Sequence, residues 1–173
     1  MKKLLSFVLA AALCAPAFAQ KRGNAPSIAQ TIESEVGKLS LNYAAHPFAE
    51  GKTFAMLMDK ENGAAARKNI SERAAKSPMG SFVSSVDVMC GDQHLVAGTY
   101  DVFFTIGDDL AWSINFRSGD KVQSHKLALA DSGHESKRLM MCLYASDKGA
   151  GVYIAFGKMS GDLQIVPHKA ETK

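Results

Sequence analysis

The chain has 173 residues, of which 47% are hydrophobic, and a formal net charge of +3 at pH 7. This length is sufficient for one domain that buries a hydrophobic core of its own. The charge is too small to give an electrostatic basis for nucleic-acid binding, which needs a pronounced basic surface.

The first nineteen residues have the features of a secretory signal peptide. Lys2 and Lys3 form a charged start, residues 4–13 form an apolar run, and residues 17–19, Ala-Phe-Ala, form a small-x-small cleavage sequence. The apolar run is shorter than the roughly 20 residues that a membrane-spanning helix needs. We therefore expect cleavage after Ala19 and a periplasmic or secreted location.

The mature chain that this cleavage leaves is nearly neutral. It has 154 residues (173 − 19), and its formal charge is +1 because the signal removes two lysines and no acid. A lipoprotein signal at Cys14 is the alternative, and bulky Leu13 disfavours it because a small residue is needed before the cysteine. No later stretch is apolar enough to predict a membrane span.

Two cysteines remain in the mature chain, Cys90 and Cys142, and each lies in an apolar run that predicts a strand. In an oxidising compartment, two cysteines predict one disulfide. Two free thiols buried as small hydrophobic groups are the alternative. The sequence leaves both open because pairing requires Cα atoms within about 7 Å of each other.

The N-terminal part of the mature chain predicts a flexible start and two strands. Residues 20–27 form the flexible start, and residues 28–35 form a strand. In residues 37–43 apolar and polar side chains alternate, which is typical of a half-buried strand. Residues 52–61 fit either a short strand or a helical turn, because their apolar residues cluster rather than alternate.

Residues 62–76 predict the one clear helix. Asn62 is suited to cap its N-terminus, and Ser77-Pro78 ends it. Its apolar face is thin, so we expect it to pack on the surface or edge of a sheet. A solvated face is expected to carry the basic residues Arg67, Lys68, Arg73 and Lys76.

Strands are predicted from Ser81 to the C-terminal end, separated by glycine and aspartate turns. The central pair is a hairpin around residues 107–109, with Tyr100, Phe104, Trp112, Ile114 and Phe116 expected in the core. Burial of Trp112 predicts that its replacement by alanine costs about 3–5 kcal/mol. Short strands at regular spacing predict a single antiparallel β-sandwich over residues 28–168, with one inserted helix.

The central hairpin also carries a family resemblance. Residues 95–116, LVAGTYDVFFTIGDDLAWSINF, resemble the exported bacterial domain-of-unknown-function family 2911, whose members have Leu-x-Ala-Gly-x-Tyr followed by a Trp-x-Ile-x-Phe strand. Residues 30–43, QTIESEVGKLSLNY, and residues 51–54, GKTF, are similar to the start of that family. The resemblance implies export and a sandwich fold. The family's Trp-Arg-x-Gly-Ala-Asn-Glu-like segment is replaced here by the helix at residues 62–76.

No catalytic or metal-binding motif stands out. No two of the five histidines are spaced two to four residues apart, as zinc ligands often are: His46, His94, His125, His134 and His168. There is no Gly-x-Ser-x-Gly motif for a nucleophile. Asp108 and Asp109 are explained by turn geometry better than by calcium binding.

The prediction is therefore a non-enzymatic exported binding or structural module, with no cofactor and an unidentified small-molecule or protein partner. One alternative is a small hydrolase or carbohydrate-active enzyme built from scattered polar residues such as His46, His94 and Asp101. Another alternative is metal handling, in which methionine thioethers bind copper(I). The methionines considered for this role are Met56, Met58, Met140 and Met141, and packing in the core explains them better.

Overall fold

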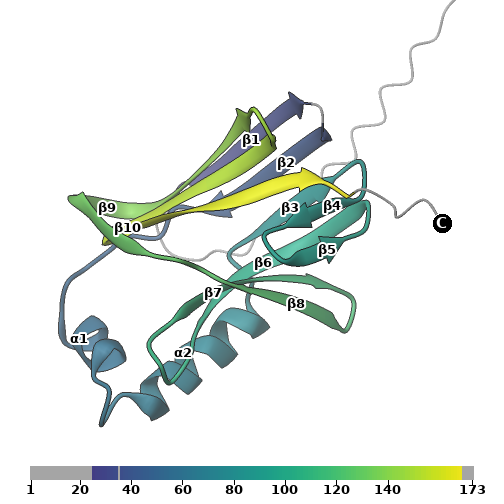
Figure 1. The fold of residues 1–173 in the computed structure, drawn as a ribbon. Helices are drawn as coiled ribbons and strands as arrows, with labels where there is room; N and C mark the ends of the chain where they lie inside the picture. The colour runs from purple at the N-terminus through teal and green to yellow at the C-terminus, as the bar shows by residue number, and fades with distance from the viewer. Residues whose placement is uncertain (1–24, 35, 169–173) are drawn as a thin grey trace, which may run out of the picture.

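Two antiparallel sheets pack against each other around the hydrophobic core (Figure 1). The computed structural model describes residues 25–34 and 36–168. The predicted signal peptide, its cleavage site and residues 20–24 of the flexible start lie outside the described residues. The prediction of an antiparallel β-sandwich is confirmed.

The larger sheet has six strands in the order β1-β2-β3-β6-β7-β8. Their bounds are β1 Ser27–Ser34, β2 Gly37–Ala44, β3 Gly80–Ser84, β6 Gly98–Ile106, β7 Trp112–Ser118 and β8 Lys121–Lys126. The register places Phe82 opposite Tyr100 and Val102 opposite Phe116. Large apolar side chains from neighbouring strands therefore meet on the inner face, where cross-strand pairs stabilise a sheet.

The smaller sheet has four strands in the order β5-β4-β10-β9. Their bounds are β4 Val88–Cys90, β5 Gln93–Leu95, β9 Ala130–Ser146 and β10 Gly149–Pro167. The register of β9 with β10 shifts between Ala155 and Met159. Such bulges bend a strand, and here the irregular part of β10 faces the end of the sandwich where the two helices lie.

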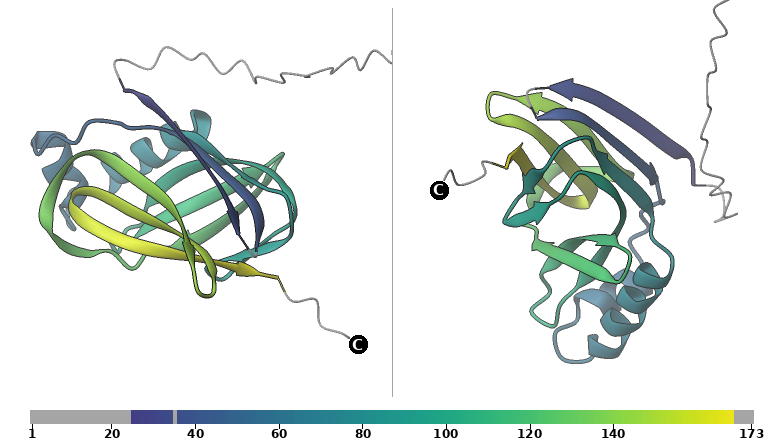
Figure 2. Two further views of the ribbon diagram at one scale, coloured as in Figure 1. Left: turned by 90° about the horizontal axis from the view of Figure 1, so that it is seen from above. Right: turned by 90° about the vertical axis from the view of Figure 1, so that its right-hand side faces the viewer.

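Two helices, rather than the one predicted, connect β2 to β3: α1, Lys52–Met58, and α2, Ala64–Lys76. Both lie on the side of the molecule away from β1 (Figure 2). Of the two alternatives left open for residues 52–61, a short strand or a helical turn, the structure shows the helix. The expected cap by Asn62 is wrong, because Gly63 is the N-cap residue and no side chain bonds there. Asn62 instead donates to the Asp59 carboxylate, which closes the turn between the helices.

The basic residues of α2 do not share one solvated face. Arg67 is only 1% exposed, and its guanidinium donates to the carbonyl oxygens of Leu57 at 3.1 Å and Asp59 at 2.6 Å. Asp108 lies 3.6 Å from the same guanidinium. Arg67 therefore joins the C-terminal end of α1 to α2, because those carbonyls have no partner within their own helix.

The central hairpin of β6 and β7 differs from its predicted pattern on both faces. Tyr100, Ile114 and Phe116 are buried as expected, whereas Phe104 and Trp112 are only partly buried. The opposite face of the hairpin was expected to be exposed to solvent, yet Phe103 and Asn115 are buried there. The physical reason is that α2 packs along β6 and covers that face.

We expect Phe116→Ala to destabilise the protein by about 3–5 kcal/mol, the usual range for a buried aromatic residue. Phe116 is 2% exposed and contacts the rings of Phe82 and Tyr100. Trp112→Ala is the matched comparison, and we expect a smaller loss because this ring is only partly buried. Urea unfolding of both variants measures the difference, and an equal or larger loss for Trp112→Ala contradicts the assignment.

Candidate functional site

A cavity of about 680 Å³ lies between the two sheets, at the end where α2 packs. Apolar side chains from both sheets line most of it, among them Phe104, Ile106, Trp112, Leu139, Ile154 and Phe156. Its volume is in the range of about 300–1,000 Å³ that is typical of small-molecule sites.

The cavity exists because β3 is shorter than β6. Pairing between these strands ends at Gly80 and Val102, so residues 103–106 of β6 have no neighbouring strand on that side. Helix α2 occupies this position, and the Ser71 hydroxyl accepts a hydrogen bond from the Ile106 backbone N–H at 3.1 Å. A helix does not follow the edge of a sheet as closely as a strand does, so space remains between α2 and the two sheets.

One face of α2 forms a wall of the cavity. Ile70, Arg73, Ala74 and Ser77 line it, at the spacing i, i+3, i+4 and i+7 that places residues on one side of a helix. Two of these residues, Ile70 and Ala74, belong to the thin apolar face expected of this helix. Arg73 shares their face, although it was expected among the solvated basic residues.

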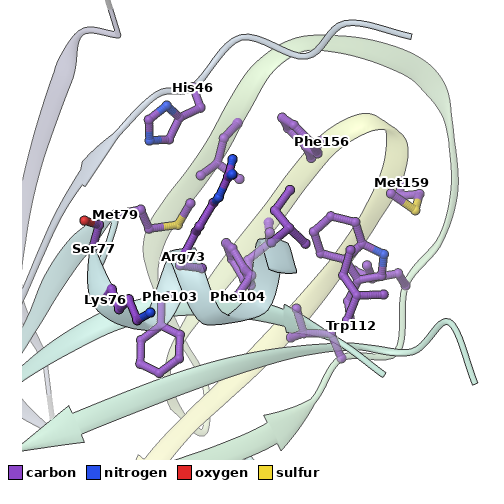
Figure 3. A pocket seen from close by; sticks show the side chains of 17 residues that line it. His46, Arg73, Lys76, Ser77, Met79, Phe103, Phe104, Trp112, Phe156 and Met159 are labelled. Carbon is purple, nitrogen blue, oxygen red and sulfur yellow. The ribbon is translucent and has the colours of Figure 1, made fainter. Parts of the chain in front are cut away.

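The polar side chains of the cavity gather at one end. In Figure 3, Arg73, Lys76, Ser77 and His46 lie on one side, whereas Trp112 lies on the other with Phe156 and Met159. Arg73 and Lys76 are exposed to solvent, while Leu139 and Ile154 are buried. No acidic side chain lines this cavity in the described part of the chain. The site thus has an apolar floor and a basic rim.

The three polar residues singled out in the sequence lie in three separate places. His46 follows β2 and lines the cavity. His94, on β5, stacks on the ring of His168 at 3.8 Å and lies 3.4 Å from the Asp87 carboxylate. Asp101, on β6, pairs with Arg117 at 2.6 Å. These residues do not converge, so the arrangement that the hydrolase alternative needs is not assembled from them.

Two histidine–aspartate pairs lie outside the cavity, near β5 and β8. The Ala97 backbone N–H donates to Asp87 at 2.9 Å and holds the pKa of that carboxyl below its usual range, and His94 lowers it further. A hydrogen bond with His125 likewise lowers the pKa of Asp92. Asp87 and Asp92 are exposed, and ion pairs at exposed positions contribute little to stability. These pairs therefore hold surface loops and strands rather than form a site.

The described residues contain no group of three or more His, Cys, Asp or Glu side chains placed to hold a metal ion. Two of the four methionines considered for copper, Met140 and Met141, are neighbours on β9 that face opposite sides of the sheet, at 43% and 1% exposure. Asp109 accepts the Ala111 backbone N–H and pairs with Lys126, which agrees with the turn role inferred for it.

Cys90 and Cys142 are both free thiols, so the disulfide left open by the sequence does not form in this structure. Cys90 is buried on β4 opposite Ile165 of β10, whereas Cys142 is exposed on β9 opposite Tyr153. The two β10 positions are twelve residues apart (165 − 153). The thiols therefore lie at distant points of the sheet and on opposite faces. The alternative of two buried thiols holds only for Cys90.

We expect one of these two thiols to react with Ellman's reagent in the native protein, and both after denaturation. Burial raises the pKa of the Cys90 thiol, so the reactive thiolate is scarce there, while Cys142 is accessible. Cys142→Ser should abolish the native reaction and Cys90→Ser should preserve it. A mature protein that shows no free thiol even when denatured would indicate the disulfide instead.

No family model matches the chain, and comparisons with curated proteins and with solved structures give no significant match. Among the described residues, no helix is long and apolar enough to cross a membrane.

Proposed function

We propose that this protein is a binding module that takes a largely apolar small molecule into the cavity between its sheets. The observation that carries the proposal is the cavity itself, with about 680 Å³ of space and mostly aromatic and aliphatic walls. An apolar cavity of this size favours an apolar occupant, because filling it removes apolar surface of both partners from water.

The site lies between the two sheets at one end of the sandwich. The walls come from α2, both sheets and the segment between β8 and β9, so a ligand would contact parts of the chain that are far apart in sequence. Ile70, at 39% exposed, is an apolar residue at the edge of the cavity and provides an apolar entrance.

Trp112 offers a direct test, because it lines the cavity and is the only tryptophan of the chain. We expect dodecan-1-ol, an uncharged probe, to change the Trp112 emission saturably. Shortening the probe should weaken binding by about fourfold per methylene, since each buried CH₂ contributes about 0.8 kcal/mol.

The variant Ala74→Phe should weaken this binding by filling the cavity from α2. Ala65→Phe is the matched control on the same helix, because Ala65 is exposed and does not line the cavity. Thermal unfolding of both variants without probe checks that they are folded. Absence of a saturable emission change in the parent protein, or equal binding by Ala74→Phe, would contradict the proposal.

Export, signal cleavage and membership in family 2911 remain predictions, and we propose them alongside the binding role. For the cleavage, we expect Gln20 to be the first residue of the protein recovered from a bacterial periplasm or culture medium. Mass spectrometry of the intact protein measures this, with an Ala19→Gln variant, which removes a small residue of the cleavage sequence, expected to keep its signal.

A further inference from the structure

Building on the proposed function, we infer that the ligand is a single-chain amphiphile with an anionic head group, carboxylate or phosphate, and that Arg73 and Lys76 bind this head group at the rim. The tail would then occupy the apolar floor beside Trp112. The inference specifies both the chemical class of the ligand and its direction in the cavity.

The positive charge of the rim is not matched by any side chain of the described residues. Among the described residues, neither the Arg73 guanidinium nor the Lys76 ammonium group forms a hydrogen bond or ion pair. The other three arginines of this part of the chain each have a partner: Arg67 with Asp108, Arg117 with Asp101, and Arg138 with the carbonyl of Ala45. Arg73 therefore keeps its donors available, and a guanidinium presents them in a planar fork that matches carboxylate and phosphate oxygens.

The cavity wall carries no acidic side chain among the described residues. A cationic head group at this rim would meet two positive charges and no counter-charge. Arg73 and Lys76 do lie near the C-terminus of α2, where the helix dipole amounts to about half a negative charge. Two full positive charges exceed it, and Arg117 already donates to the nearby carbonyl of Ala75 at 2.6 Å.

The cavity also determines the direction in which an amphiphile would bind. A charge on the apolar floor would lose its water without gaining a partner, which is costly. At the exposed rim, the head group keeps part of its hydration and gains the side chains of Arg73 and Lys76, while the tail covers Leu139, Ile154 and the ring of Trp112. In Figure 3 the basic side chains lie on one side, with Met79 and Phe103 beside them, and the side with Trp112 and Met159 is apolar, which matches an amphiphile bound lengthwise.

The test compares four probes with the same twelve-carbon tail on the mature protein: dodecanoate, dodecyl phosphate, dodecan-1-ol and dodecyltrimethylammonium. Titrations follow the Trp112 emission at pH 8 and below the micelle concentration of each probe. We expect the anions to bind about two- to fivefold more tightly than the alcohol, within the range for one solvent-exposed ion pair, and the cation to bind most weakly. Added salt should reduce the preference for anions. Whichever of dodecanoate and dodecyl phosphate binds more tightly identifies the head group as carboxylate or phosphate.

Charge-removing variants locate the effect. The double variant Arg73→Gln, Lys76→Gln should bind dodecanoate no more tightly than it binds dodecan-1-ol. Lys68→Gln is the control, because Lys68 is exposed on the same helix and does not line the cavity. Arg73→Lys, with its charge retained, should keep part of the preference.

Each outcome bears on one of the two proposals. Equal binding of all four probes overturns the inference and leaves the apolar cavity as a binding site. A preference for anions that survives in the double variant overturns the assignment to Arg73 and Lys76. Failure of every probe to bind overturns the proposed function together with the inference.

Discussion

The pairing of β3 with β6 ends at Gly80 and Val102, and the remaining edge of β6 must be satisfied by another element. Helix α2 takes this position, with the Ser71 hydroxyl accepting the Ile106 N–H and with Arg117 donating to the carbonyl of Ala75. The same substitution of a helix for a strand buries Phe103 and opens the cavity, which both Phe103 and Phe104 line. Both features follow from one shortened strand.

The core and the cavity divide the space between the sheets. Toward β1 and β2 the core is filled by side chains such as Leu39, Phe82 and Phe116. At the opposite end, Phe104 and Trp112 remain partly exposed because no side chain fills the space in front of them. Protein interiors are normally packed at nearly the density of organic crystals. An apolar space of this size is therefore unusual, and it is the feature of the fold that best fits a bound ligand.

Of the residues that line the candidate site, only His46 was predicted from the sequence as a possible site residue. The signal for the rest was present in α2, where Ile70, Ala74 and Ser77 share a face with Arg73. This spacing places Arg73 with the apolar stripe, yet a basic residue on a short helix is usually solvated, and nothing in the chain shows which sheet the helix will meet. The three polar candidates failed to converge because His94 and Asp101 are on strands of different sheets.

The sequence by itself determined the sandwich and most of its strands, because period-two alternation depends only on local side-chain direction. It also determined where α2 ends and that Tyr100, Ile114 and Phe116 are buried. Only the tertiary structure decided the faces of the central hairpin, the separation of Cys90 from Cys142 and the cavity. These depend on which strands pair and where that pairing stops, and such contacts join residues far apart in the chain, which local patterns do not encode.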